Sequence, residues 1–310
     1  MSRGSLARLG LLALIWGSSF TLIKIALEGL SPIQIVLVRL VTAAVVLLLI
    51  VRLRRLRLPR ERGLWAHLAV LGIVANIVPF FLIGWGEQRI TSGLAGVLNG
   101  TTPLFTMAFA AAALPEERLH RLRAVGLLIG FLGVVLVVGP WDQNPLTSSL
   151  PGQLACLGAS ACYGTAFVYT RRFVAGRHPP MVLAAAQITM AAALLTLLAP
   201  VVARTPVTLS PSVVASGLLL GAFGTGAAYL LYYRLVTDAG ATSASMVTYL
   251  IPVVAVTLGV VALAEPVTWN LFAGAAVVIA GVATAEGRIP GLRTPATAGD
   301  APALAPEPPR

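Results

Sequence analysis

The chain has 310 residues, of which 57% are hydrophobic and 11% are charged, and its formal net charge is +11. This composition excludes an ordinary soluble domain, because such domains carry about 25% charged residues. The basic excess alone would fit a nucleic-acid partner. The distribution of the basic residues, described below, argues against one.

Ten apolar stretches follow one another along the chain, each long enough for the about 20 helical residues that cross a bilayer core. The alternating pattern of β-strands is absent, and a helix satisfies its own backbone hydrogen bonds in lipid. We therefore expect an all-α integral membrane protein with ten transmembrane helices. The expected spans are 8–28, 33–53, 64–85, 92–113, 121–139, 152–172, 181–202, 211–234, 242–263 and 268–286.

Two halves of the sequence carry matching residues displaced by 147 to 149 positions. The matches include Trp16 with Tyr163, Gly72 with Gly221, Pro103 with Pro252, Glu117 with Glu265, and Gly126 with Gly274. Each half holds five expected spans, and this odd number requires the second copy to enter the membrane from the opposite side. The fold prediction is two inverted five-helix repeats, at 8–139 and 152–286. A proline-rich tail at 287–310 is expected to be disordered and cytoplasmic.

The basic residues predict the orientation of the chain. With a cytoplasmic N terminus, 18 of the 22 lysines and arginines fall in inner loops and tails, including six arginines between Arg52 and Arg62. Positive residues concentrate on the cytoplasmic side of membrane proteins. We therefore expect a multi-pass protein of the inner (plasma) membrane with both termini cytoplasmic. The arginine clusters are expected to set this topology and to contact membrane lipid, and no nucleic-acid partner is predicted.

Acidic residues and histidines are expected at the periphery. All 11 acidic residues fall in loops, tails or span ends, and the three histidines are also peripheral. This excludes the usual proton relay, metal site or intramembrane protease, which need ionisable groups within the membrane. We predict neither a cofactor nor a metal, and we predict that the chain is not an enzyme.

Prolines at matching places in the fourth and ninth spans point to the centre of the protein. Pro103 and Pro252 each remove one helical hydrogen bond and free the carbonyl four residues earlier, that of Asn99 or Thr248. Such carbonyls need a partner within the membrane, and matched interruptions indicate a transporter's binding site. The residues predicted to line the pathway are Asn99, Thr101, Thr248 and Tyr249. The alternative is a structural kink whose carbonyl is bonded by Thr101 or Thr102.

Three further residues are candidates for the same pathway. Asn76 is a polar side chain within the third span, and Tyr229 is the deepest of several aromatic residues near span ends. Trp16 lies well inside the first span, where it either lines the cavity or packs against neighbouring helices. Aromatic belts at the membrane interface are the alternative for the tyrosines.

Two cations, Lys24 and Arg39, lie within expected spans at similar depth. Lys24 is four residues from Glu28, so an ion pair on one helical face is expected. In the repeat, Lys24 aligns with Arg171 and Arg39 aligns near Gln187. We expect these four residues, Lys24, Arg39, Arg171 and Gln187, to form gates that attract a carboxylate. The alternative is snorkelling or structural pairing of the two cations.

Several short motifs in order resemble the drug/metabolite transporter superfamily, in particular a chain with two EamA domains. They are W-G-S-S-F at 16–20, L-V-R-L at 37–40, L-P-E-E-R-L at 114–119, Y-L-L-Y-Y-R-L at 229–235, Y-L-I-P-V at 249–253 and A-E-P-V at 264–267. The resemblance covers about Leu11 to Glu286. It implies a ten-helix carrier of the kind that exports amino acids and other small metabolites.

We therefore expect a secondary transporter that exports small metabolites, in particular amino acids or related compounds, by alternating access. One alternative is a carrier for multidrug or hydrophobic-cation efflux, which would be expected to hold a deep carboxylate. The other is a non-transporting membrane sensor or assembly partner, which the short loops disfavour. The expected partners are a small-molecule substrate and membrane lipid, and a homodimer is left open.

Overall fold

The computed structural model describes residues 2–114, 121–139, 141, 149–240 and 244–287, and every regular element in these ranges is a helix. The elements are α1 (Arg3–Ala26), α2 (Pro32–Leu53), α3 (Arg62–Gly72), η1 (Ile73–Ile77), α4 (Val78–Glu87), α5 (Ser92–Asn99), α6 (Thr102–Ala113), α7 (Arg121–Val138), α8 (Leu150–Phe173), α9 (Pro180–Val202), α10 (Pro211–Gly221), η3 (Ala222–Ala227), α11 (Ala228–Ala239), α13 (Val247–Leu263) and α14 (Trp269–Ala285). The tail from 288 onward and the motif at 115–119 lie outside the described residues.

The described helices are long and apolar enough for a membrane protein. Seven stretches reach the length and hydropathy of a membrane span: Arg3–Ala26, Pro32–Leu53, Arg62–Glu87, Ser92–Ala113, Arg121–Val138, Pro180–Val202 and Pro211–Ala239. Two shorter apolar helices, α13 and α14, follow them. Helix α8 has 24 residues but is not among the seven, because glycine, serine, threonine and tyrosine dilute its apolar character. The count of ten spans remains a prediction.

Local sequence signals start the helices where the structure places them. At the start of α2 the Gln34 side chain accepts a hydrogen bond from the Ser31 N–H at 2.8 Å, and Pro32 lies in the first turn. Ser210 accepts a hydrogen bond from the Val213 N–H at the start of α10, which again opens with proline. Proline in the first turn removes an N–H that would lack a partner, so each helix begins at a fixed residue.

Two π-helices, η1 and η3, interrupt the third helix of each half at positions 149 residues apart. Each follows a glycine that allows close helix packing. A Cβ on Gly72 would lie 3.1 Å from the Cβ of Ala191 in α9, and one on Gly221 would lie 2.7 Å from the carbonyl oxygen of Arg39 in α2. The interrupted helix of each half therefore packs against the second helix of the other half.

The matched prolines do not produce matched breaks. The fourth stretch ends as α5 at Asn99 and resumes as α6 at Thr102, whereas α13 continues as a helix through Pro252. The carbonyl freed in the first half accepts a hydrogen bond from the Thr102 hydroxyl at 2.7 Å. The structural alternative therefore holds for that carbonyl. The break contains Gly100, and glycine is a poor helix former, whereas the second half has Tyr249 at the equivalent position.

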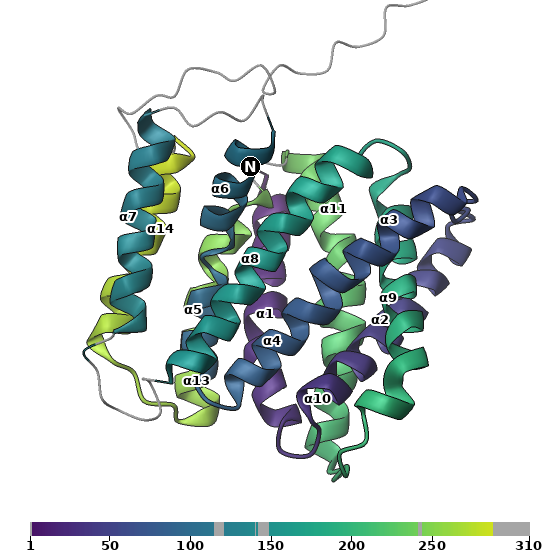
Figure 1. Ribbon diagram of the computed structural model, residues 1–310, viewed down its shortest axis with the longest axis horizontal. Helices are drawn as coiled ribbons and strands as arrows, with labels where there is room; N and C mark the ends of the chain where they lie inside the picture. Colours follow the sequence, from purple (N-terminus) through teal and green to yellow (C-terminus); the bar gives the residue numbers. More distant parts are fainter. Residues whose placement is uncertain (1, 115–120, 140, 142–148, 241–243, 288–310) are drawn as a thin grey trace, which may run out of the picture.

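Helices α7 and α14 stand side by side at one edge of the bundle (Figure 1). Their backbones touch through matched glycines. A Cβ on Gly133 would lie 2.5 Å from the backbone nitrogen of Val278, and one on Gly281 would lie 2.5 Å from the Cα of Gly130. Small residues at this spacing let membrane helices approach closely. The last helices of the two halves thus join the halves within one chain.

Candidate functional site

Arg39 is a buried cation in the middle of α2, with 7% of its surface exposed. Its Nε donates a hydrogen bond to the Thr225 hydroxyl at 2.9 Å, and its guanidinium carbon lies 3.8 Å from the centre of the Phe80 ring. Within the described residues, Nη1 and Nη2 donate no hydrogen bond to the protein. The Nε edge of the guanidinium is thus held by the protein, and the N–H groups of the other edge are left for a ligand.

The surroundings of Arg39 contain no carboxylate in contact with it. Among the described residues it forms no salt bridge, and Glu87, Tyr163 and Tyr229 act on it only as electrostatic neighbours. A buried cation without an anion is costly, and a guanidinium fork matches a carboxylate in geometry. The arrangement favours a ligand that brings a carboxylate to Arg39.

A second hydrogen bond repeats the first one in the other half. Gln187 of α9 donates from Nε2 to the Oδ1 of Asn76 in η1 at 2.7 Å. Gln187 lies 148 positions after Arg39, and Thr225 lies 149 positions after Asn76. Both π-helices therefore accept a hydrogen bond at the same place from the second helix of the other half. Tyr229, which lies 149 positions after Phe80, is a neighbour of Asn76.

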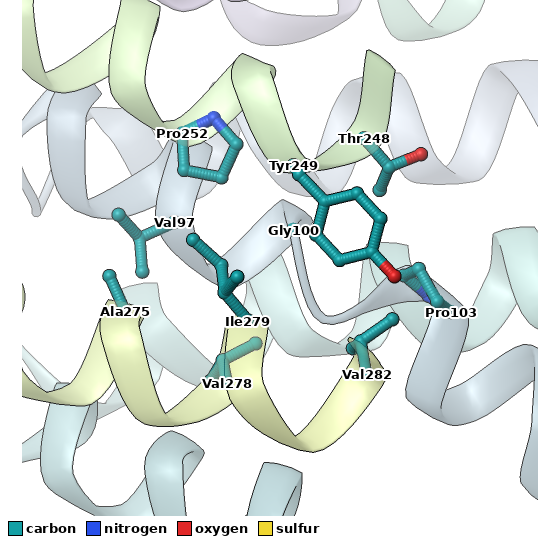
Figure 2. A pocket seen from close by; sticks show the side chains of 10 residues that line it. All are labelled: Val97, Gly100, Pro103, Thr248, Tyr249, Pro252, Ala275, Val278, Ile279 and Val282. Carbon is teal, nitrogen blue, oxygen red and sulfur yellow. The ribbon is translucent and has the colours of Figure 1, made fainter. Parts of the chain in front are cut away.

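Thr248 and Tyr249 line a separate cavity between α5, α6, α13 and α14 (Figure 2). The Tyr249 ring lies across this cavity, while the Thr248 hydroxyl points away from it. The Tyr249 hydroxyl donates to Glu286 at 2.9 Å. The cavity leaves only about 10 Å³ for the centre of a water molecule, about the minimum for one water. In this conformation it is too small for an amino acid.

Asn99 and Thr101, predicted for the same pathway, are not among the residues that line this cavity. Thr101 is fully buried and its hydroxyl donates to the Leu98 carbonyl at 2.6 Å, which is a structural role. The Oδ1 of Asn99 is buried and has no hydrogen-bond partner among the described residues. Of the two, Asn99 retains an acceptor for a ligand.

The remaining predicted residues lie apart from Arg39. Lys24 does not pair with Glu28 but donates to the carbonyls of Glu87 at 2.5 Å and Ile90 at 2.7 Å. The reason is that the turn after α4 presents free carbonyls to α1, and cations are favourable at helix C-termini. Arg171 is exposed at the end of α8. Trp16 packs on Tyr232 with 5.8 Å between ring centres.

An apolar groove lies close to the Arg39 site. It has about 290 Å³ for the centres of water molecules and lies between α1, α10, η3 and α13. Gly224 lines it, and a Cβ on this glycine would lie 3.2 Å from the Ser19 Oγ and 4.0 Å from the Arg39 Nη2. The lining is Ile15, Ser18, Thr21, Leu22, Leu219, Phe223, Gly224 and Leu258. Gly224 is thus shared between the lining of the groove and the surroundings of the guanidinium.

Sequence reasoning did not single out Thr225, Glu87 or Phe80. The repeat offered a signal for Thr225, because the offset of 149 that pairs Gly72 with Gly221 also pairs Asn76 with Thr225. The π-helices left no such signal, since they depend on packing between the halves. The structure brings Arg39, Asn76, Gln187 and Tyr229 into one region and leaves Thr248 and Tyr249 in another.

Comparisons with known proteins agree with this architecture. A model of the EamA-like transporter family matches residues 7–139 and 150–285. An uncharacterized transporter of Archaeoglobus fulgidus is 30% identical, with 88% of this chain and 95% of the relative aligned. The uncharacterized inner membrane transporter YedA of Escherichia coli is 31% identical over 80% of this chain and 79% of its own.

Two further similarities extend over almost the whole chain. A probable terminal-alkyne amino-acid exporter of Streptantibioticus cattleyicolor is 28% identical over 91% of this chain and 93% of its own. A crystal structure with 21% identity covers 92% of this chain and 97% of its own with a TM-score of 0.64, and this shows a common fold.

Proposed function

The chain belongs to the EamA-like transporter family, and on this premise we propose that it exports small carboxylate-bearing metabolites, in particular amino acids. It is a multi-pass transporter of the inner membrane rather than an enzyme. The amino-acid exporter of S. cattleyicolor supports this substrate class by similarity. Within the chain, the observation that carries the proposal is the buried Arg39 guanidinium with one edge unbonded.

The proposed architecture is ten transmembrane helices in two inverted five-helix repeats, with both termini cytoplasmic. The repeat offsets, the two π-helices and the basic residues of the loops support it. In this arrangement the Arg39–Thr225 and Gln187–Asn76 contacts lie at the interface of the two halves. Alternating access would break and remake such contacts as one half moves against the other.

Purified full-length protein in liposomes tests the substrate class directly. Exchange of labelled against unlabelled solute is measured for the common L-amino acids, with choline and tetraphenylphosphonium as cation probes. We expect exchange of one or more amino acids above that of empty liposomes. Exchange of the cations alone would replace our proposal by hydrophobic-cation efflux. Exchange of none of these solutes would contradict the proposed transport function.

Arg39→Gln tests the site in the same assay. This substitution places in the first half the residue, glutamine, that the second half has at the equivalent position 187. Loss of a charge-assisted hydrogen bond costs about 1.5–3 kcal/mol, so the KM for amino acids should rise by about 10- to 100-fold. Arg89→Gln is the matched control, because Arg89 is an exposed arginine that stacks on Trp85. An unchanged KM in Arg39→Gln would remove Arg39 from the binding site.

A further inference from the structure

Glu87 is the last residue of α4, and its side chain is completely buried. Neither carboxylate oxygen has a hydrogen-bond partner among the described residues. The sequence places Glu87 at the end of a span, and the structure keeps it there but seals it from solvent. Buried carboxylates in proteins are normally paired or bonded. This one therefore requires a physical explanation.

The charged and titratable groups that face Glu87 come from four other elements. They are Lys24 of α1, Arg39 of α2, Cys156 of α8 and Glu265 between α13 and α14. Lys24 donates to the backbone carbonyl of Glu87 and to that of Ile90, so its ammonium holds the main chain rather than the carboxylate. Its positive charge offsets only part of the cost of a buried anion.

Glu265 cannot serve as a hydrogen-bond donor to Glu87 while it is ionised, and its oxygens are already occupied. They accept from the Ser92 N–H at 2.8 Å, the Ser92 hydroxyl at 2.9 Å and the Gly93 N–H at 3.1 Å. Glu265 thus caps the N-terminus of α5, where a negative charge is favourable. Glu87 occupies the opposite kind of place, the C-terminus of α4, where a negative charge is unfavourable.

These contacts make the sealed conformation compatible with a neutral Glu87. An ionised carboxylate there would lack hydrogen bonds, face a second carboxylate and lie at the negative end of a helix. A proton removes all three costs. When α1 separates from the turn after α4, the Lys24 contacts break and water can reach the carboxylate, which then favours ionisation.

We propose that Glu87 is a proton-binding site whose protonation is linked to closure of the contact between α1 and the α4–α5 turn. The proton is taken from water onto a carboxylate oxygen when the contact closes and returns to water when it opens. Combined with the proposed export function, on which this step rests, the linkage makes the rate of substrate exchange depend on the pH of the water that reaches Glu87 when the contact opens.

Cys156 provides a native reporter next to this site. It is completely buried, and a Cβ on Gly86 would lie 2.7 Å from its sulfur, so α4 and α8 pack closely beside Glu87. Cys156 also belongs to one buried cluster with Ile23 of α1 and Ile90 of the α4–α5 turn. In a Cys162→Ser background, modification of Cys156 by N-ethylmaleimide therefore measures how often the packing around this contact opens. The measurement needs no substrate. It therefore stays informative if the proposed transport function is wrong.

The decisive comparison is between the parent protein and Glu87→Gln, the neutral isostere, at each pH. From about pH 6 to about pH 8 the ratio of the two labelling rates, parent over variant, should rise by about threefold or more, since one linked proton allows up to about tenfold per pH unit. The direct effect of the carboxylate on the thiol has the opposite sign, because a nearby negative charge disfavours the reactive thiolate. A constant or falling ratio would overturn the proposal.

Two controls keep the outcome clear. Glu28→Gln removes an exposed carboxylate four residues after Lys24, and it should retain the pH response of the parent protein. Loss of the response in that variant would also overturn the assignment to Glu87. If Glu87→Gln does not fold, the parent's Cys156 profile is compared with that of an exposed cysteine introduced by Arg57→Cys. A profile no steeper than this reference counts against the proposal.

Transport separates the two proposals. For each amino acid that exchanges, the exchange rate of the parent protein should change by about threefold or more between about pH 6 and about pH 8, with equal pH on both sides. Glu87→Gln should keep exchange and lose this pH dependence. Exchange without any pH dependence in the parent protein overturns the proton site and leaves the exporter. A pH-dependent Cys156 response without exchange of any solute supports the proton site and overturns the exporter.

Discussion

Arg39 and Gln187 occupy equivalent positions on α2 and α9, and each donates a hydrogen bond to the π-helix of the other half of the chain. The acceptors, Thr225 and Asn76, are equivalent as well. The two contacts identify places where the halves meet, and π-helices, which interrupt regular helical hydrogen bonding, often mark functional sites. Only one of the two contacts carries a charge.

The Arg39–Thr225 contact predicts a difference between two small substitutions. Thr225→Val removes the acceptor and leaves the buried Nε–H without a partner, at a cost of about 1.5–3 kcal/mol, so the melting temperature in detergent should fall. Thr225→Ser keeps the hydroxyl and should lose much less. Equal melting temperatures for the two variants would show that the hydrogen bond does not stabilise the protein.

The α7–α14 pair predicts sensitivity to a single methyl group. In Gly281→Ala the new Cβ would overlap the backbone of Gly130, which should destabilise the protein by about 1–3 kcal/mol. Gly10→Ala is the control, because Gly10 lies within α1 with no atom within 4 Å of its Cβ position. That variant should be stabilised by about 0.5–1 kcal/mol. Thermal unfolding of both variants checks the prediction.

The groove beside Gly224 predicts selectivity by side-chain size. Gly224→Val places methyl groups between Ser19 and Arg39, so exchange of large amino acids such as phenylalanine should fall more than exchange of alanine. A competition assay in liposomes measures the ratio of the two. Gly10→Val, in open space on α1, should leave the ratio unchanged. An equal decrease in the exchange of both amino acids would show that the groove does not select substrates by size.

Glu61 predicts a pH dependence of stability at a loop. Its own backbone N–H and then His178, whose Nε2 lies 3.1 Å from Oε2, hold the pKa of Glu61 below its usual value. A carboxyl with a lower pKa in the folded state stabilises folding above its unfolded pKa and loses this contribution as pH falls through the folded pKa. The melting temperature of the parent protein should therefore exceed that of Glu61→Gln near about pH 5. Below about pH 3 the difference should vanish, whereas a constant difference would argue against the ionised pair.

The proposed orientation predicts which loops react with an impermeant thiol reagent. In a protein without its two native cysteines, Arg57→Cys should react only from the cytoplasmic side, because its loop is dense in arginine. Val207→Cys, exposed in the segment between α9 and α10, should react only from the outer side. The reverse pattern would invert the assignment of both termini.

The sequence predicted the helical class and the two-copy design because hydropathy and repeat offsets are local or periodic signals. It located Arg39 and Gln187 as equivalent positions for the same reason. It did not predict the π-helices or the burial of Glu87, since both arise from packing between segments far apart in the chain. The prolines misled in part, because the freed Asn99 carbonyl is bonded by the neighbouring Thr102 rather than left for a ligand.

The contact of α7 with α14 has a consequence for how the protein diverges between its copies. In a dimer of identical subunits, each with one five-helix repeat, the positions equivalent to Arg39 and Gln187 would hold the same residue. Such a dimer would have either two arginines there or none. A single chain carries both copies, and the last helices of the two copies, α7 and α14, pack against each other. One copy can therefore have a cation, Arg39, while the other has a neutral amide, Gln187. The presence of both copies in one chain therefore permits a single positive charge at this pair of positions.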